Sequence, residues 1–215
     1  MHYRRIDELP EVIPVFPLAG ALLLPEGELP LNIFEPRYLA MFGDAMAGAR
    51  IIGIVQPTQP LAPAHEPPIY PIGCAGRINA YKETDDGHFL INLTGVCRFS
   101  IVHELDTEEP YRLVTAAYER YRADIEGDTG AGIDSTELFP ALRAYLDAKD
   151  LSADWDRIEQ LPGAALVTSL AMACPFAPSE KQALLEAPSL TERGRLMTAL
   201  MEMAVLEPAE STPLQ

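Results

Sequence analysis

Short apolar runs, several of them alternating with polar residues, fill the first 121 positions of the chain, and prolines interrupt them repeatedly. Alternation with a period of two is typical of β-strands that have one buried face. Because proline has no N–H for a central strand ladder, its density here favours short, edge-like or bulged strands. The near-regular spacing of these segments predicts a β-barrel or sandwich. The segments predicted as strands are Val12–Phe16, Leu18–Leu24, Leu29–Phe34, Arg50–Gln56, Ile72–Glu83, Phe89–Leu93, Val96–Leu105 and Tyr111–Tyr121.

One helix is predicted inside this strand-rich part, directly after Phe34. Pro36 suits the first turn of a helix, where its missing N–H costs nothing. Glu35 places a carboxylate at the positive end of that helix. The helix is expected to run from Pro36 to about Ala47 and to stop at Gly48. Its predicted apolar face consists of Leu39, Phe42, Ala45 and Met46.

The pattern changes after residue 121. Residues 122–134 are rich in Asp, Glu and Gly and are interpreted as a linker. Helical periodicity follows, and two of the later segments begin with a capping-box sequence, at Ser179 and at Ser189. The last helix is expected to place Leu196, Leu200, Met203 and Leu206 on one face. The predicted helices are Thr136–Lys149, Asp154–Leu161, Gly163–Cys174, Ser179–Glu186 and one that starts after Ser189.

The predicted organisation is therefore a strand domain over residues 1–121, a linker over 122–134, a helical domain over 135–207 and a frayed tail over 208–215. A loop at residues 57–71 is too rich in proline for regular structure.

The charge of the chain limits its partners. It has 16 basic and 32 acidic residues, which gives a formal net charge of −16. An acidic surface repels nucleic acid and anionic membranes, which argues against both as main partners. No apolar run reaches the length of a membrane helix, and we expect no signal peptide. Cys74, Cys97 and Cys174 show no paired spacing, so reduced cysteines and a cytoplasmic location are expected.

A search for chemistry finds no phosphate-binding loop, no serine elbow and no histidine pair at metal-ligand spacing. Two weaker leads are Ser169 with Lys181 and Cys97 beside Arg98, whose charge would lower the pKa of the thiol. The simpler interpretations are a helix serine bonded to its own backbone and a cysteine buried in a strand. We therefore expect no catalytic residue, no metal site and no cofactor.

The remaining candidate is an apolar surface around the start of the predicted helix. Aromatic and methionine side chains are concentrated there, and methionine makes adaptable contacts. In the alternative interpretation the aromatic rings belong to the core and Glu35 with Arg37 forms a structural ion pair. Exposure of Phe34 and Tyr38 would favour binding. The candidate residues for polypeptide contact are Phe34, Glu35, Arg37, Tyr38, Phe42 and Met46.

Motifs spread over most of the chain resemble, in their order, the N-terminal domain of the Lon protease family. The resemblance is closest to the stand-alone form of that domain, in which a proline-rich opening precedes an IFEPRY-like turn. The segments that carry it are Ile13–Leu18, Leu29–Leu31, the helix after Pro36, Ile51–Val55, Ile72–Ile78, Leu93–Phe99, Lys181–Glu186, and Arg193 with the leucines after it.

The resemblance implies an α+β fold, with an N-terminal PUA-like β pseudo-barrel followed by a C-terminal helical bundle. In full-length Lon proteases this domain helps to recognise protein substrates and to assemble the oligomer, and ATPase and Ser–Lys protease domains follow it. These 215 residues contain neither later domain. The resemblance therefore implies a non-enzymatic module that recognises a polypeptide or protein partner, in an adaptor or chaperone-like role. It names neither the partner nor the oligomeric state.

Two alternatives stay open. PUA-like barrels often bind RNA, and a local basic strip would serve that role despite the net charge. The other alternative is an enzyme with a pocket at the junction of the two domains, for which Cys97 and Arg98 are the lead. The residues of the basic strip would be Arg77, Arg98, Arg112, Arg120 and Arg122.

Overall fold

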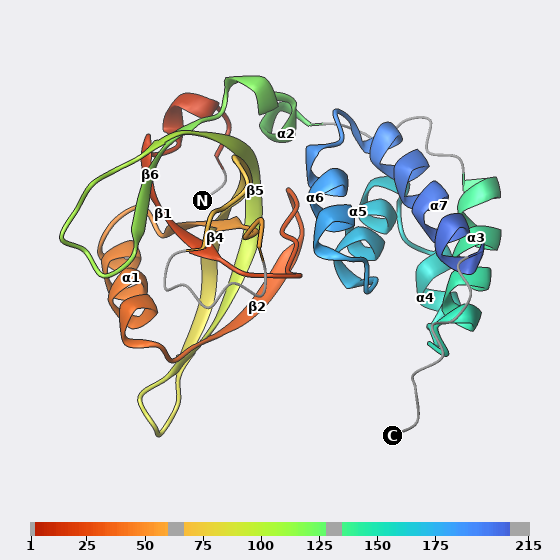
Figure 1. Ribbon diagram of the computed structural model, residues 1–215, viewed down its shortest axis with the longest axis horizontal. Helices are drawn as coiled ribbons and strands as arrows, with labels where there is room; N and C mark the ends of the chain where they lie inside the picture. Colours follow the sequence, from red (N-terminus) through yellow and green to blue (C-terminus); the bar gives the residue numbers. More distant parts are fainter. Residues whose placement is uncertain (1–2, 60–66, 128–134, 207–215) are drawn as a thin grey trace. The chain divides into compact units, whose positions relative to one another are not determined.

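A computed structural model describes residues 3–59, 67–127 and 135–206 of the chain (Figure 1). The described residues fall into two compact units. Unit 1 takes those within 1–128 and 168–186, and unit 2 takes those within 129–167 and 187–215. The predicted α+β class, with a strand pseudo-barrel first and helices after it, is confirmed.

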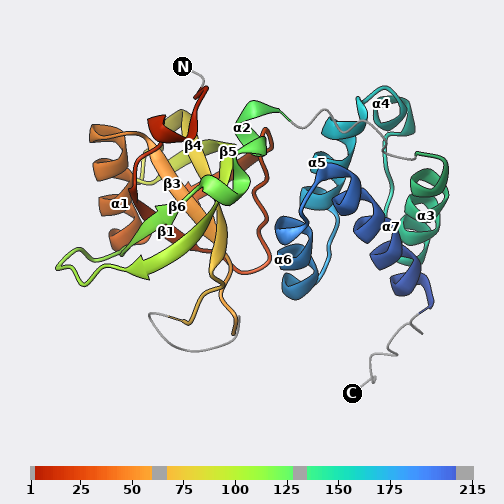
Figure 2. The ribbon, with the colours of Figure 1, turned by 90° about the horizontal axis from the view of Figure 1, so that it is seen from above.

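A six-stranded sheet forms the centre of unit 1. The sheet order is β2-β5-β4-β3-β1-β6, and β6 also pairs with β5. That extra pairing closes five strands, β1, β3, β4, β5 and β6, into a ring, and Figure 2 labels all five. Strand β2 lies outside the ring and pairs with β5. Among the strand pairs of the described residues, β1–β3 alone is parallel. The strands are β1 Val12–Pro17, β2 Glu28–Ile33, β3 Ile51–Val55, β4 Ile72–Glu83, β5 Phe89–Glu104 and β6 Arg112–Ala117.

The interior of the ring is built around Phe99 of β5, which is fully buried. A Cβ atom on Gly53 or on Gly73 would lie 2.8 Å from the Phe99 ring, so these two glycines make room for it. β5 is one continuous strand, whereas the sequence predicted a break at Gly95. Ala75 of β4 pairs with Cys97 and Gly76 pairs with Gly95, so Val96 has no partner on β4. This extra residue forms a β-bulge, which lets β5 continue as one strand.

One predicted strand is wrong, and a second is wrong in part. Residues 18–24 form a loop instead of a strand, with Gly20 at a φ of 73° and Leu22 to Leu24 buried. The segment predicted as Tyr111–Tyr121 leaves the strand at Ala117 and continues as a 3-10 turn, η2 Glu119–Tyr121. Part of the expected linker is helical, because α2 covers Ala123–Glu126, and residues 128–134 lie outside the described part. A 3-10 turn, η1 Ile6–Glu8, precedes β1.

The helix predicted after Phe34 is α1, Pro36–Ala47, and its start at Pro36 and end before Gly48 are confirmed. Its predicted apolar face is confirmed at Phe42 and Ala45 and is wrong at Leu39 and Met46. The buried residues are Tyr38, Met41, Phe42 and Ala45, whereas Leu39 and Met46 are half-buried. Two overlapping stripes satisfy the helical spacing, and the packing of the aromatic rings selects one of them.

The remaining helices include α3, in which the apolar residues Leu138, Leu142, Tyr145 and Leu146 are all buried. In α7, Ser189 accepts a hydrogen bond from the Glu192 N–H, as its capping sequence predicts, but Met203 and Leu206 are exposed. The buried face of α7 instead includes Arg193 and Gly194, which no apolar pattern reveals. These helices are α3 Ser135–Ala148, α4 Trp155–Glu159, α5 Gly163–Ala173, α6 Pro178–Glu186 and α7 Leu190–Leu206.

Helix α6 belongs to unit 1 and is held there by buried polar side chains. The Gln182 amide donates to the Ile72 carbonyl at 3.2 Å, and the Gln56 amide donates to the Pro178 carbonyl at 3.0 Å. The Lys181 ammonium donates to the Gly20 carbonyl at 2.9 Å. The Glu180 carboxylate accepts from the Ala177 N–H, so the cap lies before the predicted Ser179. The predicted domain boundaries stay predictions; the contacts group residues 168–186 with the sheet.

No helix in the described part of the chain combines the length and the apolar character needed to cross a membrane.

Candidate functional site

The six predicted contact residues do not share one surface. Phe34 is 54% exposed. Glu35, Arg37 and Met46 are half-buried, while Tyr38 and Phe42 are 7% and 5% exposed. Tyr38 and Phe42 therefore reach no partner unless α1 moves.

The two buried aromatic rings attach α1 to the sheet. The ring of Tyr38 lies 4.1 Å from that of Phe16 on β1, and burial raises the pKa of the Tyr38 hydroxyl. Phe42 packs 4.6 Å from Phe89 on β5 and 5.7 Å from Tyr81 on β4. These contacts fit the core interpretation of both residues.

Glu35 and Arg37 form an ion pair, in which Arg37 Nη2 donates to Glu35 Oε2 at 2.9 Å. The Glu35 side chain makes no capping hydrogen bond to the helix, although Glu35 is the N-cap residue. The Arg37 guanidinium also lies 4.5 Å above the Tyr38 ring. Both partners are thus used within the helix start, and this half-exposed pair orders the turn that carries Phe34.

The exposed side of the β2–β5 end carries what we name the Phe34 patch: Phe34, His88 and Leu90. The Phe34 and His88 rings are 5.8 Å apart. In the antiparallel pairing of β2 with β5, Ile33 lies opposite Phe89, so the end of β2 lies beside the start of β5. His88 and Leu90 are two residues apart and project to the same side of β5, opposite to Phe89. Leu90 is 47% exposed, so the patch is an apolar surface beside an edge strand.

Strand β2 gives this patch a backbone edge. β2 pairs with β5 alone among the described strands. An edge strand presents alternate N–H and C=O groups that an added strand can pair with. Pro30 removes one donor, and the side chains of Leu29 and Leu31 are half-buried. The sequence did not link Leu90 to Phe34, because that link depends on the β2–β5 register.

The cysteine lead for catalysis is not supported by its surroundings. Cys97 is fully buried, and burial raises the pKa of its thiol to about 12, opposite to the lowering expected from Arg98. The Arg98 guanidinium instead binds the Asp124 carboxylate at 2.7 Å and the Leu185 carbonyl at 3.0 Å. This thiol therefore stays protonated at neutral pH.

The serine–lysine lead is also weakened. Ser169 is exposed on α5. The Lys181 ammonium donates to the carbonyls of Gly20 and Met172, and burial lowers its pKa. The lysine is therefore used to hold α6 on unit 1. Among the described residues, no group of three or more potential ligands could hold a metal ion.

The arginines of the proposed basic strip are largely committed to neighbours. Arg98 binds Asp124, Arg112 binds Glu104 at 2.8 Å, and Arg122 lies 3.6 Å from Glu126. Arg77 and Arg120 lie over the rings of Tyr3 and Tyr121. Charges paired in this way offer little to a phosphate backbone.

A family model described as the ATP-dependent protease La (LON) substrate-binding domain matches residues 12–203. The chain belongs to this family. The match to the LON substrate-binding domain includes every strand of unit 1 and most of α7. The predicted family is thereby confirmed.

Relatives from two bacteria illustrate the extent of the similarity. The chain is 27% identical over 201 residues to "Lon protease 2" of Myxococcus xanthus, which covers 91% of this chain and 24% of that protein. It is 26% identical over 208 residues to "Lon protease" of Anaeromyxobacter dehalogenans, covering 91% and 23%. The chain thus spans about a quarter of the length of these relatives.

Two solved structures share the fold. A Lon N-terminal domain protein from Xanthomonas campestris has a TM-score of 0.63 and 20% identity, covering 87% of this chain and 97% of its own. The N-terminal domain of a Mycobacterium avium complex Lon protease has a TM-score of 0.58 and 16% identity, covering 89% and 98%. At these identities the likeness concerns the fold of the LON substrate-binding domain.

Proposed function

We propose that unit 1 is a non-enzymatic recognition module that binds extended apolar segments of polypeptides. The observation that carries this proposal is the exposed Phe34 at the end of edge strand β2, in a member of the LON substrate-binding domain family. The Phe34 patch supplies an apolar anchor, and the open edge of β2 supplies backbone pairing.

The chemistry of the patch supports a peptide in extended form. A strand added to a sheet edge gains main-chain hydrogen bonds, while its alternate side chains enter neighbouring pockets or patches. Phe34 offers a large aromatic contact area, and Leu90 adds an aliphatic surface beside it. The net charge of −16 favours neutral or basic segments over acidic ones.

An adaptor or chaperone-like role is the finer part of the proposal. In that role the module holds an unfolded or regulatory polypeptide and leaves any processing to another protein. A cytoplasmic location and the absence of catalysis remain part of this proposal. No observation among the described residues favours the RNA-binding alternative or the alternative of an enzyme at the domain junction.

The experiment measures binding of fluorescently labelled apolar peptides to the full chain by anisotropy. Phe34→Ala is expected to weaken binding at least tenfold, the effect of removing an interface anchor. The matched control is Tyr81→Ala, because Tyr81 is 55% exposed but contacts Phe42 on the α1 side. Equal affinity of wild type and Phe34→Ala would remove the patch from the proposal.

The edge of β2 is tested with the same peptides carrying N-methyl groups on alternate backbone nitrogens. Methylation on one alternating set removes the donors that face β2 and is expected to abolish binding, whereas the other set is tolerated. If both sets bind as well as the parent peptide, strand addition is excluded. Tyr38→Ala is unsuitable as a test because Tyr38 belongs to the core.

A further inference from the structure

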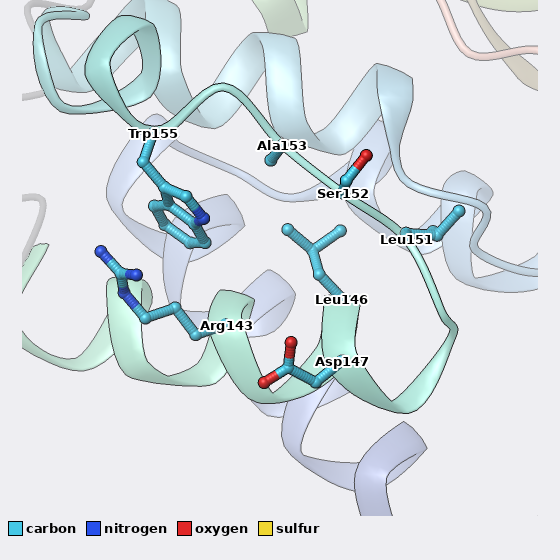
Figure 3. Close-up of a pocket in the computed structure, with 7 residues that line it drawn as sticks. All are labelled: Arg143, Leu146, Asp147, Leu151, Ser152, Ala153 and Trp155. Atoms are coloured by element: carbon cyan, nitrogen blue, oxygen red, sulfur yellow. The ribbon is translucent and has the colours of Figure 1, made fainter.

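A pocket in unit 2 lies between the C-terminal half of α3 and the segment that leads into α4 (Figure 3). Its volume is about 300 Å³. Its lining combines charged, aromatic and aliphatic side chains, and none of them belongs to the Phe34 patch. The main lining residues are Arg143, Leu146, Asp147, Leu151, Ser152 and Trp155.

The local sequence shapes this pocket. α3 ends at Ala148, and Asp150 has a φ of 53°, so the chain reverses there. The Leu151 N–H then donates to the Leu146 carbonyl at 2.8 Å, which folds the connection back onto α3. The Asp154 carboxylate caps α4 and so fixes Trp155 in its first turn.

The positive charge in the lining is already engaged. The Arg143 guanidinium lies 3.7 Å above the Trp155 ring, and its Nη2 donates to Glu159 at 3.3 Å. Figure 3 shows this stack at one end of the pocket. An incoming anion would therefore have to displace Glu159, and an incoming guanidinium would find the Trp155 face occupied.

The negative charge is not engaged in the same way. Asp147 lies one turn after Arg143 on α3, and within the described part of the chain its carboxylate makes no hydrogen bond or ion pair. Figure 3 shows Leu146 between this carboxylate and Ser152, with Leu151 at the far rim. The pocket thus offers an acidic acceptor next to an aliphatic surface, and this combination fits a cation on an aliphatic stem.

We propose that this pocket binds a lysine side chain of a polypeptide, with the ammonium on Asp147 and the methylene stem along Leu146 and Leu151. Lysine carries a compact charge on a flexible aliphatic stem, whereas arginine gains most from bidentate pairing and aromatic stacking. A volume near 300 Å³ suits one side chain. The acidic chain attracts cationic ligands. This site is independent of the function proposed for unit 1.

The test uses Trp155, the only tryptophan in the sequence, as a local fluorescent reporter. The full chain is titrated with Nα-acetyl-lysine amide and with the neutral analogue Nα-acetyl-norleucine amide. A saturable fluorescence change is expected for the lysine probe, with at least tenfold weaker binding of the norleucine probe. Saturation-transfer NMR of each probe measures the same binding without relying on fluorescence.

Asp147→Asn is expected to weaken binding of the lysine probe at least tenfold. The matched control is Asp150→Asn, because Asp150 does not line the pocket and asparagine tolerates its positive φ. Phe34→Ala must leave the titration unchanged, which separates this site from that of unit 1. Equal binding of both probes, equal loss in both aspartate variants, or no binding of the lysine probe by either method would each overturn the proposal.

Discussion

The two sides of the sheet at the end of β2 use similar residues for opposite purposes. On one side, Phe42 of α1 packs against Phe89 and Tyr81. On the other side, Phe34 and Leu90 are about half-exposed, and only His88 contacts the Phe34 ring among the aromatic neighbours in the described residues. Phe34 and Phe42 are eight residues apart in the sequence, yet one builds the core and the other faces solvent. The comparison shows that aromatic density alone does not identify a binding surface.

The largest expected effect is that of Phe42→Ala, which is predicted to lower the free energy of unfolding of unit 1 by about 3–5 kcal/mol. The substitution removes a ring that is 5% exposed and leaves a cavity between α1 and the sheet. Hydrogen exchange of the β5 amides measures the free energy of unfolding of unit 1. Tryptophan fluorescence would not, because Trp155 belongs to unit 2. A loss below about 1 kcal/mol would show that α1 collapses onto the sheet without the ring.

The interior of the ring is also expected to respond to alkaline pH. The pKa of the Cys97 thiol is raised to about 12 by burial, from an ordinary value of 9.0. Its folded-state pKa lies above the unfolded one, so the stabilising contribution is complete below pH 9.0 and falls as pH rises towards about 12. Urea unfolding between pH 7 and 10.5 is predicted to show declining stability. Cys97→Ala should decline less steeply; an unchanged slope would assign the decline to other groups.

The Glu35–Arg37 ion pair is expected to contribute little to the stability of unit 1. Glu35→Gln removes the charge that faces Arg37, and because both side chains are partly exposed the predicted loss is below about 1 kcal/mol. The difference between wild type and variant should shrink further in 1 M NaCl, where exposed charges are screened. A salt-independent loss of 2 kcal/mol or more would instead make Glu35 a necessary part of the helix start.

The smallest expected effect on stability is that of Phe34→Ala. The predicted change is within about 0.5 kcal/mol, as for other surface substitutions. Hydrogen exchange of the β5 amides measures it beside Phe42→Ala, so the two phenylalanines are compared in one assay. Destabilisation equal to that of Phe42→Ala would place Phe34 in the core and contradict the comparison.

The start of α1 could be predicted from the sequence because Pro36 is a local signal, but its buried face could not. Tyr38 and Met41 compete with Leu39 and Met46 for the same helical spacing, and only the positions of Phe16 and Phe89 decide between them. The Phe34 patch could not be predicted from the sequence either. Leu90 lies near Phe34 only because of the register between β2 and β5, which are far apart in the sequence.

The pocket of unit 2 left no sequence signal at all. Asp147 and Trp155 match no motif, and they share a cavity only because Asp150 reverses the chain between them. The strands of the ring, in contrast, were mostly predictable, because alternation and turn residues act locally. Local sequence patterns therefore predict helices and strands well, but they do not predict surfaces that distant segments create.

The attachment of α6 to unit 1 has a consequence for the order in which the chain is made. The barrel strands are complete at residue 117, yet the carbonyls of Pro178 and Leu185, which receive the Gln56 and Arg98 side chains, are synthesised last in unit 1. Until the ribosome has passed residue 186, these buried donors have no native acceptor from α6. The barrel therefore gains these buried acceptors only after α6 has been translated, and a fragment cut at residue 128 would lack them.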